Sequence, residues 1–247
     1  MAIPALLVGI SSAPNVTAAN KIATPNFDIS YANISDDLAN RFGDDIEQTY
    51  RNISAYLGNK VSGKIIVSIK DDHFFPHYKI KTKTIAVPAN RLRGDASGPP
   101  SLRGRGPGEA ALVTNVLAIS TNKKWAKFLD TGLEIFLQEK FGKEYDRAYP
   151  TMGKEIHKTT AATYRRYNQL FPLMEVEEVR TRRQRLVGVR QLAYLQEASF
   201  VKFLIEKHGK NKFFDVFYGK PFETTYGKKF GMLEQEWITL INSTRIR

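Results

Sequence analysis

The residues best suited to chemistry are the four histidines and the carboxylates near them. His73 and His77 follow Asp71 and Asp72 within one short segment, and this composition could hold a metal ion. Pro76 lies between the two imidazoles and disfavours a helix that would present them one turn apart. Polar residues of a loop at the end of a strand are therefore the favoured interpretation of this segment.

The other two histidines have ordinary structural interpretations. His157 lies close to Glu155, and His208 ends an expected helix, where a histidine commonly acts as a cap. The chain contains no cysteine, which excludes disulfides, cysteine-based zinc sites and a thiol nucleophile.

Positive charge is concentrated in two arginine-rich segments. The chain carries 37 Lys and Arg against 25 Asp and Glu, a formal net charge of +12. Such a field favours an anionic partner. The candidate binding residues are Arg91, Arg93, Arg103, Arg105, Arg182, Arg183 and Arg185. No nucleic-acid-binding motif accompanies them, so an acidic peptide or anionic polymer is the favoured partner, and nucleic acid stays open as the less favoured one.

The first half is expected to combine strands with one long helix. Residues 27–31 alternate like a strand, and the next strand is predicted over 64–70. Between them, Ser35 is suited to cap a helix whose apolar residues recur at helical spacing as far as Leu57. Gly58 then suits the left-handed position that ends a helix.

A third strand is predicted over 78–87, followed by a long loop over 88–107. Lys79, Lys81 and Lys83 alternate onto one face of this strand, so it is expected to be half-exposed or an edge. The loop is rich in Arg, Gly, Pro and Ser. The remaining chain is expected to be helical, over 109–119, about 125–142, 191–208, 212–217 and 233–241.

The fold class is therefore α+β, with a small N-terminal sheet and a mostly helical C-terminal part. We expect one domain over 26–247, divided into a sheet-containing part at 26–106 and a helical part at 107–247. Residues 1–25 are expected to be a leader or a disordered tail. An apolar run is followed there by Val16 and Ala18, the small-residue spacing of a signal-peptidase site, so export to the periplasm or outside the cell is expected. No transmembrane segment is expected.

Two stretches resemble the gluzincin metallopeptidases, specifically the peptidase-MA-like family. The stretch from Phe128 to Leu137 is similar to that family's W-L-x-E-G-L-A-x-Y segment, and 191–205 with 230–237 are similar to its closing helices. The resemblance covers about residues 26–242 and implies a gluzincin-like fold.

The resemblance also implies a zinc site whose ligands are absent. The family carries H-E-x-x-H on one helix and a third ligand, a glutamate, on the next. The preferred register places Ala111 and Asn115 at the histidines, Leu112 at the base and Thr131 at the third ligand. A second register keeps Glu109 at the base but also lacks both histidines. In either register no family-type zinc site can form, so no cofactor and no metal are expected.

Three functions follow as hypotheses. The favoured one is a non-catalytic relative of these peptidases, exported, that binds a peptide or an anionic polymer. The second is a hydrolase with a site rebuilt from groups such as Glu109, Glu134 or His157. The third is a basic protein that binds nucleic acid.

Overall fold

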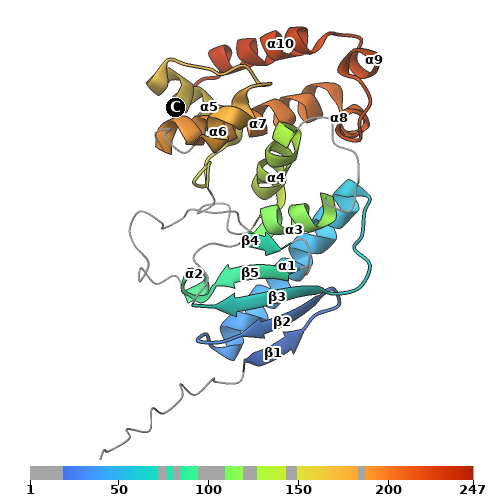
Figure 1. Ribbon diagram of the computed structural model, residues 1–247, viewed down its shortest axis with the longest axis vertical. Helices are drawn as coiled ribbons and strands as arrows, with labels where there is room; N and C mark the ends of the chain where they lie inside the picture. Colours follow the sequence, from blue (N-terminus) through green and yellow to red (C-terminus); the bar gives the residue numbers. More distant parts are fainter. Residues whose placement is uncertain are drawn as a thin grey trace, which may run out of the picture.

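The computed structural model describes residues 19–71, 77–79, 84–93, 109–118, 127–142, 149–182 and 187–246. The described strands are β1 (Asn20–Ala23), β2 (Phe27–Tyr31), β3 (Ile65–Lys70), β4 (His77–Lys79) and β5 (Thr84–Pro88). The described helices are α1 (Asp36–Leu57), α2 (Ala89–Arg93), α3 (Glu109–Ala118), α4 (Lys127–Phe141), α5 (Ile156–Tyr167), α6 (Val176–Thr181), α7 (Val187–His208), α8 (Lys210–Phe217), α9 (Phe222–Tyr226) and α10 (Phe230–Ser243). The sheet and α1 form one end of the molecule, α5 to α10 form the other, and α3 and α4 lie between them (Figure 1). The expected α+β class is confirmed.

The sheet has five strands in the order β1-β2-β3-β5-β4. The three central strands run parallel, and the two edge strands pair antiparallel to their neighbours. Along β2, Phe27, Ile29 and Tyr31 are buried while Asp28 is exposed, which is the alternation that one covered face requires.

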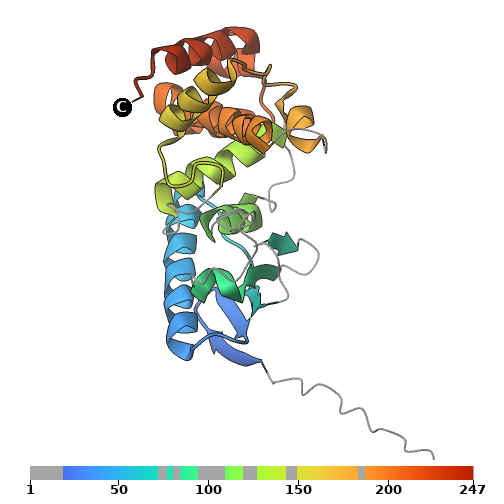
Figure 2. The ribbon, with the colours of Figure 1, turned by 90° about the vertical axis from the view of Figure 1, so that its left-hand side faces the viewer.

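Helix α1 covers that face and connects two parallel strands. Ser35 caps its first turn by accepting a hydrogen bond from the backbone N–H of Leu38, and Gly58 ends it in the left-handed region at φ 70°. The buried side of the helix includes Ile46 and Ile53, both fully covered. Figure 2 shows α1 lying along one face of the sheet. Ile46 and Ile53 belong to the same hydrophobic core as the inward residues of the strands.

Three expectations for this part are corrected. The single strand predicted over 78–87 is two strands, because the chain reverses and pairs Tyr78 with Ile85. The predicted loop begins with a short helix, α2, and the predicted tail contains β1, which joins the sheet beside β2. Lys81 and Lys83 lie outside the described residues.

Helix α7 is the centre of the helical part. It packs against α4, α5, α6, α8 and α10. Its buried residues, from Leu192 to Ile205, lie on all of its sides, as expected for a helix enclosed by others. At Gly132 the backbone of α4 lies so close to α7 that a Cβ atom added there would be 2.4 Å from the carbonyl oxygen of Glu197. Only glycine therefore fits at this position.

The predicted helices are confirmed with small shifts of their ends, and the structure describes three further helices besides α2. These are α5, α6 and α9, whose sequences offer few apolar residues; α5, for example, buries Ile156, Thr160 and Ala161. Within the described part of the chain, no helix combines the length and hydropathy needed to cross a membrane.

Candidate functional site

The first turn of α5 positions His157. Glu155, directly before the helix, accepts the backbone N–H of His157 at 3.0 Å and that of Lys158 at 2.7 Å. Its carboxylate also faces the positive end of the helix dipole. The cap therefore fixes the start of α5, and with it the place where the imidazole of His157 contacts α7.

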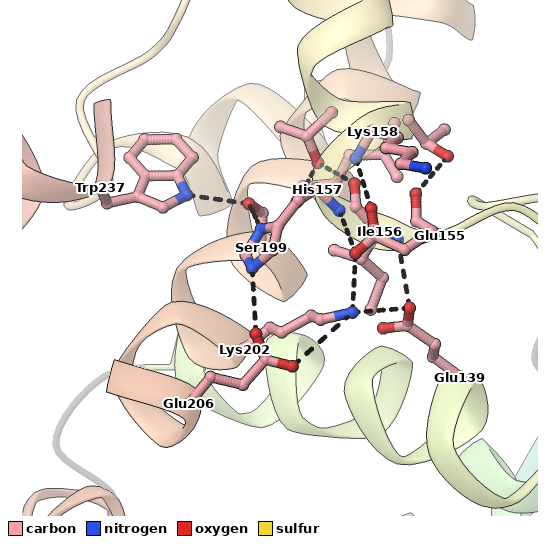
Figure 3. A network of polar contacts seen from close by, with 12 residues as sticks. Glu139, Glu155, Ile156, His157, Lys158, Ser199, Lys202, Glu206 and Trp237 are labelled. Carbon is pink, nitrogen blue, oxygen red and sulfur yellow. Dashed lines mark hydrogen bonds and ion pairs between the residues drawn. The ribbon is translucent and has the colours of Figure 1, made fainter. Parts of the chain in front are cut away.

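A chain of hydrogen bonds from α10 through α7 orients this imidazole (Figure 3). The indole Nε1 of Trp237 lies 2.9 Å from Ser199 Oγ, which lies 2.8 Å from His157 Nδ1. Because an indole N–H can only donate, the serine oxygen accepts from it. Ser199 Oγ and Nδ1 of His157 share one hydrogen bond, in which the tautomer of the imidazole decides which atom donates.

The imidazole is neutral near pH 7. Burial lowers the pKa of His157, and the charge of Lys202 acts in the same direction, while Glu155 and Glu206 oppose the shift. Nε2 lies 3.6 Å from Oε2 of Glu206, which is longer than a hydrogen bond. Nε2 of His157 is therefore a buried atom that has no hydrogen-bond partner in the described structure.

Lys202 holds the carboxylates around His157. Its Nζ lies 2.8 Å from Glu139 and 2.7 Å from Glu155, and 3.9 Å from Oε1 of Glu206. Burial opposes the ammonium charge, but the hydrogen bonds that Nζ donates to Glu139 and Glu155 raise the pKa of Lys202 overall. The lysine thus joins α4, α5 and α7 beneath the imidazole.

A pocket of about 430 Å³ opens beside His157, between α7 and α10. It is lined by His157, Phe203, Glu206, Lys207, Glu236, Thr239, Leu240 and Ser243. This volume falls in the range that small-ligand sites occupy, roughly 300 to 1,000 Å³. We call it the α7–α10 pocket.

Ser199, His157 and Glu206 have the residue types of a hydrolytic triad but not its geometry. Ser199 is fully buried, and its hydroxyl lies between Trp237 and His157. A nucleophilic serine must meet its substrate. Ser199 therefore holds the imidazole of His157 in place and does not act as a nucleophile.

The positions that the resemblance assigns to the zinc ligands and the base lie on α3 and α4. Leu112 is 2% exposed and belongs to the hydrophobic core, and Thr131 is partly exposed. The side chains of Ala111 and Asn115 lie outside the described part. No His or Cys occurs anywhere in residues 109–142.

A buried contact between Glu197 and Arg180 lies on another face of α7, and the backbone of Glu197 is close to Gly132 of α4. Glu197 is fully buried, and its Oε1 lies 3.2 Å from Arg180. Burial raises the pKa of Glu197 to about 8 against the opposing charge of Arg180, and the negative charge of Glu134 adds to the rise. Side chains two positions apart in a helix point in directions about 200° apart. Glu197 and Ser199 have this spacing, so their surroundings lie on opposite sides of α7. Glu134 and His157, two candidates for a rebuilt site, are not brought together.

The candidate arginines are described only in part. Arg93 pairs with Asp71 at 2.8 Å and donates to the carbonyl oxygen of Asn33 at 2.6 Å, and Arg182 pairs with Glu178. Both described guanidiniums thus have partners within the protein. The side chain of Arg91 and the whole of Arg103, Arg105, Arg183 and Arg185 lie outside the described residues, so a role for them stays a prediction.

Of the remaining histidines, only the side chain of His208 is described, and it does not line the α7–α10 pocket. His208 lies 3.9 Å from Glu236, and burial lowers its pKa. His73 and the side chain of His77 lie outside the described residues, and so does the side chain of Glu109. In the ranges that the structure describes, no three His, Asp or Glu side chains gather closely enough to hold a metal ion.

The sequence indicated His157 and the nearby Glu155 but not their partners on α7 and α10. Ser199, Lys202 and Glu206 are polar residues in a helix whose apolar residues dominate its pattern, and Trp237 lies in the helix expected over 233–241. A usable signal was the spacing of Ser199, Lys202 and Glu206, which recur at intervals of three and four and therefore share one helix face.

No protein-family model matches the chain, and no curated protein matches it in sequence.

Among solved structures, the chain is similar to a mutant of an M1 zinc metallopeptidase from Deinococcus radiodurans, with a TM-score of 0.44 and 14% identity. The match covers 93% of this chain and 52% of that one, so this chain spans about half its length. The similarity is distant, and the α+β architecture rests on the chain's own strands and helices.

Proposed function

We propose that this chain is a non-catalytic binding protein, related in fold to the gluzincin peptidases, whose ligand occupies the α7–α10 pocket. One observation carries the proposal. The hydroxyl beside His157 is that of Ser199, which is fully buried and accepts a hydrogen bond from Trp237, so this serine cannot reach a substrate in the pocket. The pocket is therefore suited to hold a ligand and not to cleave one with this serine.

The chemistry of α3 and α4 supports the non-catalytic part of the proposal. A zinc peptidase needs three ligands with lone pairs, and imidazole and carboxylate are the usual ones apart from thiolate. The side chain at the position of the general base is Leu112, which packs in the core. Ala111, Asn115 and Thr131 are poor substitutes for ligands.

We expect the purified full-length chain to carry far less than one equivalent of zinc and to leave casein uncleaved. The reason is the absence of imidazole and thiolate donors from residues 109–142. Elemental analysis after dialysis measures the zinc, and a fluorescent casein assay with and without added Zn²⁺ measures cleavage. Stoichiometric zinc that survives dialysis, or zinc-dependent cleavage, would contradict the proposal.

The predictions of export and of an anionic polymer or acidic peptide as partner do not depend on the residues of the pocket. They rest on residues 1–18 and on arginines that mostly lie outside the described residues. The paired state of Arg93 and Arg182 gives them no added support.

A further inference from the structure

We infer that a lysine-rich corner of the helical part binds an acidic peptide. The corner consists of Lys207, Lys212, Lys228 and Lys229, and we call it the lysine corner. These residues belong to the turn from α7 to α8 and to the turn from α9 to α10, both at the helical end of the molecule (Figure 1). The inference goes beyond the ligand of the α7–α10 pocket and does not depend on it.

Two short turns supply the positive charge. Residues 207–212 and 227–229 hold five lysines and no aspartate or glutamate. Gly209, at φ 93°, separates α7 from α8, and Gly227, at φ 68°, ends α9 just before α10. Both glycines adopt the positive φ that lets the chain turn sharply. Each group of lysines therefore lies where the chain changes direction.

Glu236 on α10 shows that the two groups of lysines meet. Its Oε2 accepts a hydrogen bond from Nζ of Lys207 at 2.8 Å, and its Oε1 accepts one from Lys228. These two hydrogen bonds lower the pKa of Glu236 to about 2, so its carboxylate is ionised at any physiological pH. The corner thus already holds a carboxylate, which is the group that an acidic peptide presents.

The lysines of the corner outnumber the acid among them. Burial lowers the pKa of the neighbouring His208, and the charges of Lys207, Lys228 and Lys212 act in the same direction. Glu236 opposes this shift, but the pKa is lowered overall, so His208 is neutral near pH 7. Four ammonium groups and one carboxylate leave the corner with an excess of positive charge, which attracts an anionic partner.

The ammonium groups keep donors for that partner. A lysine ammonium has three N–H donors, and Lys207 and Lys228 each use one on Glu236. Lys212 and Lys229 are exposed and have no hydrogen-bond or ion-pair partner among the described residues. The fifth lysine of the two turns, Lys210, lies outside the corner, because it donates to the carbonyl oxygen of Tyr56 at 3.0 Å.

The residue types favour a flexible chain of carboxylates over nucleic acid. Ammonium groups are point charges on flexible side chains, so they suit a partner that adjusts its own conformation. A single-stranded nucleic acid also needs aromatic faces on which its bases stack. The only ring in residues 207–212 and 227–229 is that of His208, which packs between Phe203 and Tyr226.

The test measures how the full-length protein binds a fluorescein-labelled oligoglutamate peptide, by fluorescence anisotropy at several salt concentrations. The double variant Lys212→Gln with Lys229→Gln removes two exposed lysines that have no partner in the described structure. We expect it to bind the peptide about fivefold more weakly at unchanged melting temperature. Because salt screens charges at the surface, this difference should shrink as the salt concentration rises.

A second double variant is the matched control. Lys21→Gln with Lys70→Gln removes the same charge from exposed residues of β1 and β3, at the other end of the molecule (Figure 1). We expect this variant to bind the peptide as the parent does.

Glu236→Gln tests the corner in the opposite direction. The substitution removes the carboxylate that Lys207 and Lys228 hold, so peptide binding should become about twofold stronger or more. Glu223→Gln, at an exposed glutamate of α9 that contacts none of the four lysines in the described structure, removes the same charge and should change binding less.

Three outcomes would overturn the inference. Equal weakening by the two double lysine variants would mean that only the net charge of the protein matters. Unchanged binding by Glu236→Gln would mean that its two lysines take no part. Tighter binding of an oligothymidine of equal charge would make nucleic acid the partner instead. None of these results bears on zinc content or casein cleavage, so failure of the inference and failure of the proposed function are distinguishable.

Discussion

Replacing Leu112 by alanine is expected to lower the free energy of unfolding by about 2 to 5 kcal/mol, the range measured for buried leucines. Leu112 is 2% exposed and packs within the main core, where α3 meets its neighbours. The substitution removes apolar contacts and leaves a cavity that a close-packed core fills only in part. Urea unfolding followed by circular dichroism measures the change.

Met232→Ala is the matched control for this substitution. Met232 lies on α10 and is 56% exposed, so its truncation should change stability by no more than about 0.5 kcal/mol. If Leu112→Ala changed stability as little as this control, Leu112 would lie at the surface. The site at which the resemblance implies a catalytic base would then be accessible, and the non-catalytic proposal would lose its main structural support.

The stability of the protein is expected to fall as the pH rises from about 5 to about 8, through Glu197. Burial raises the pKa of Glu197 from 4.5 to about 8 in the folded state. Between these values the folded chain holds a proton that the unfolded chain has released. This contribution to stability is complete below the unfolded pKa and is lost as the pH rises through the folded one.

Glu197→Gln should remove this contribution to the pH dependence. Glutamine resembles the protonated glutamate but cannot ionise, so the variant should match the parent near pH 5 and exceed its stability by a few kcal/mol above pH 8, since one pKa unit corresponds to about 1.4 kcal/mol. Urea unfolding at a series of pH values measures both proteins, and Glu223→Gln should keep the parent's profile.

The opposite result for Glu197→Gln would have a clear meaning. A loss of about 3 to 5 kcal/mol at pH 7 is the cost of removing one partner from a buried ion pair. It would show that Glu197 is ionised beside Arg180 at neutral pH and that the favourable charge interaction outweighs burial.

Local chemistry made much of the fold predictable. Ser35 and Gly58 marked the ends of α1 because caps depend on the backbone of a few neighbouring residues. Helix α5 was missed because its threonines and charged residues hide the apolar period, and its stability comes from packing on α7. The reversal between β4 and β5 was missed because a continued alternation looks the same in one strand as in two.

The candidate site was much less predictable than the fold. The bonds of Ser199 to His157 and Trp237 join residues 42 and 38 positions apart in the chain. Periodicity shows which residues share a helix face, but it does not show which faces of different helices pack against each other. The contacts of His157 depend on that packing, so they could be derived only from the structure.

The enclosure of α7 by five other helices also determines the order in which parts of the molecule open. The central turns of α7 cannot separate from their neighbours one at a time, so their amide hydrogens should exchange with deuterium only through global unfolding. Strand β1 pairs with a single neighbour and is mostly exposed, so its amides should exchange through local opening. Exchange mass spectrometry should therefore find α7 as the slowest-exchanging unit and β1 among the fastest, which makes the helical end the part that holds its structure last.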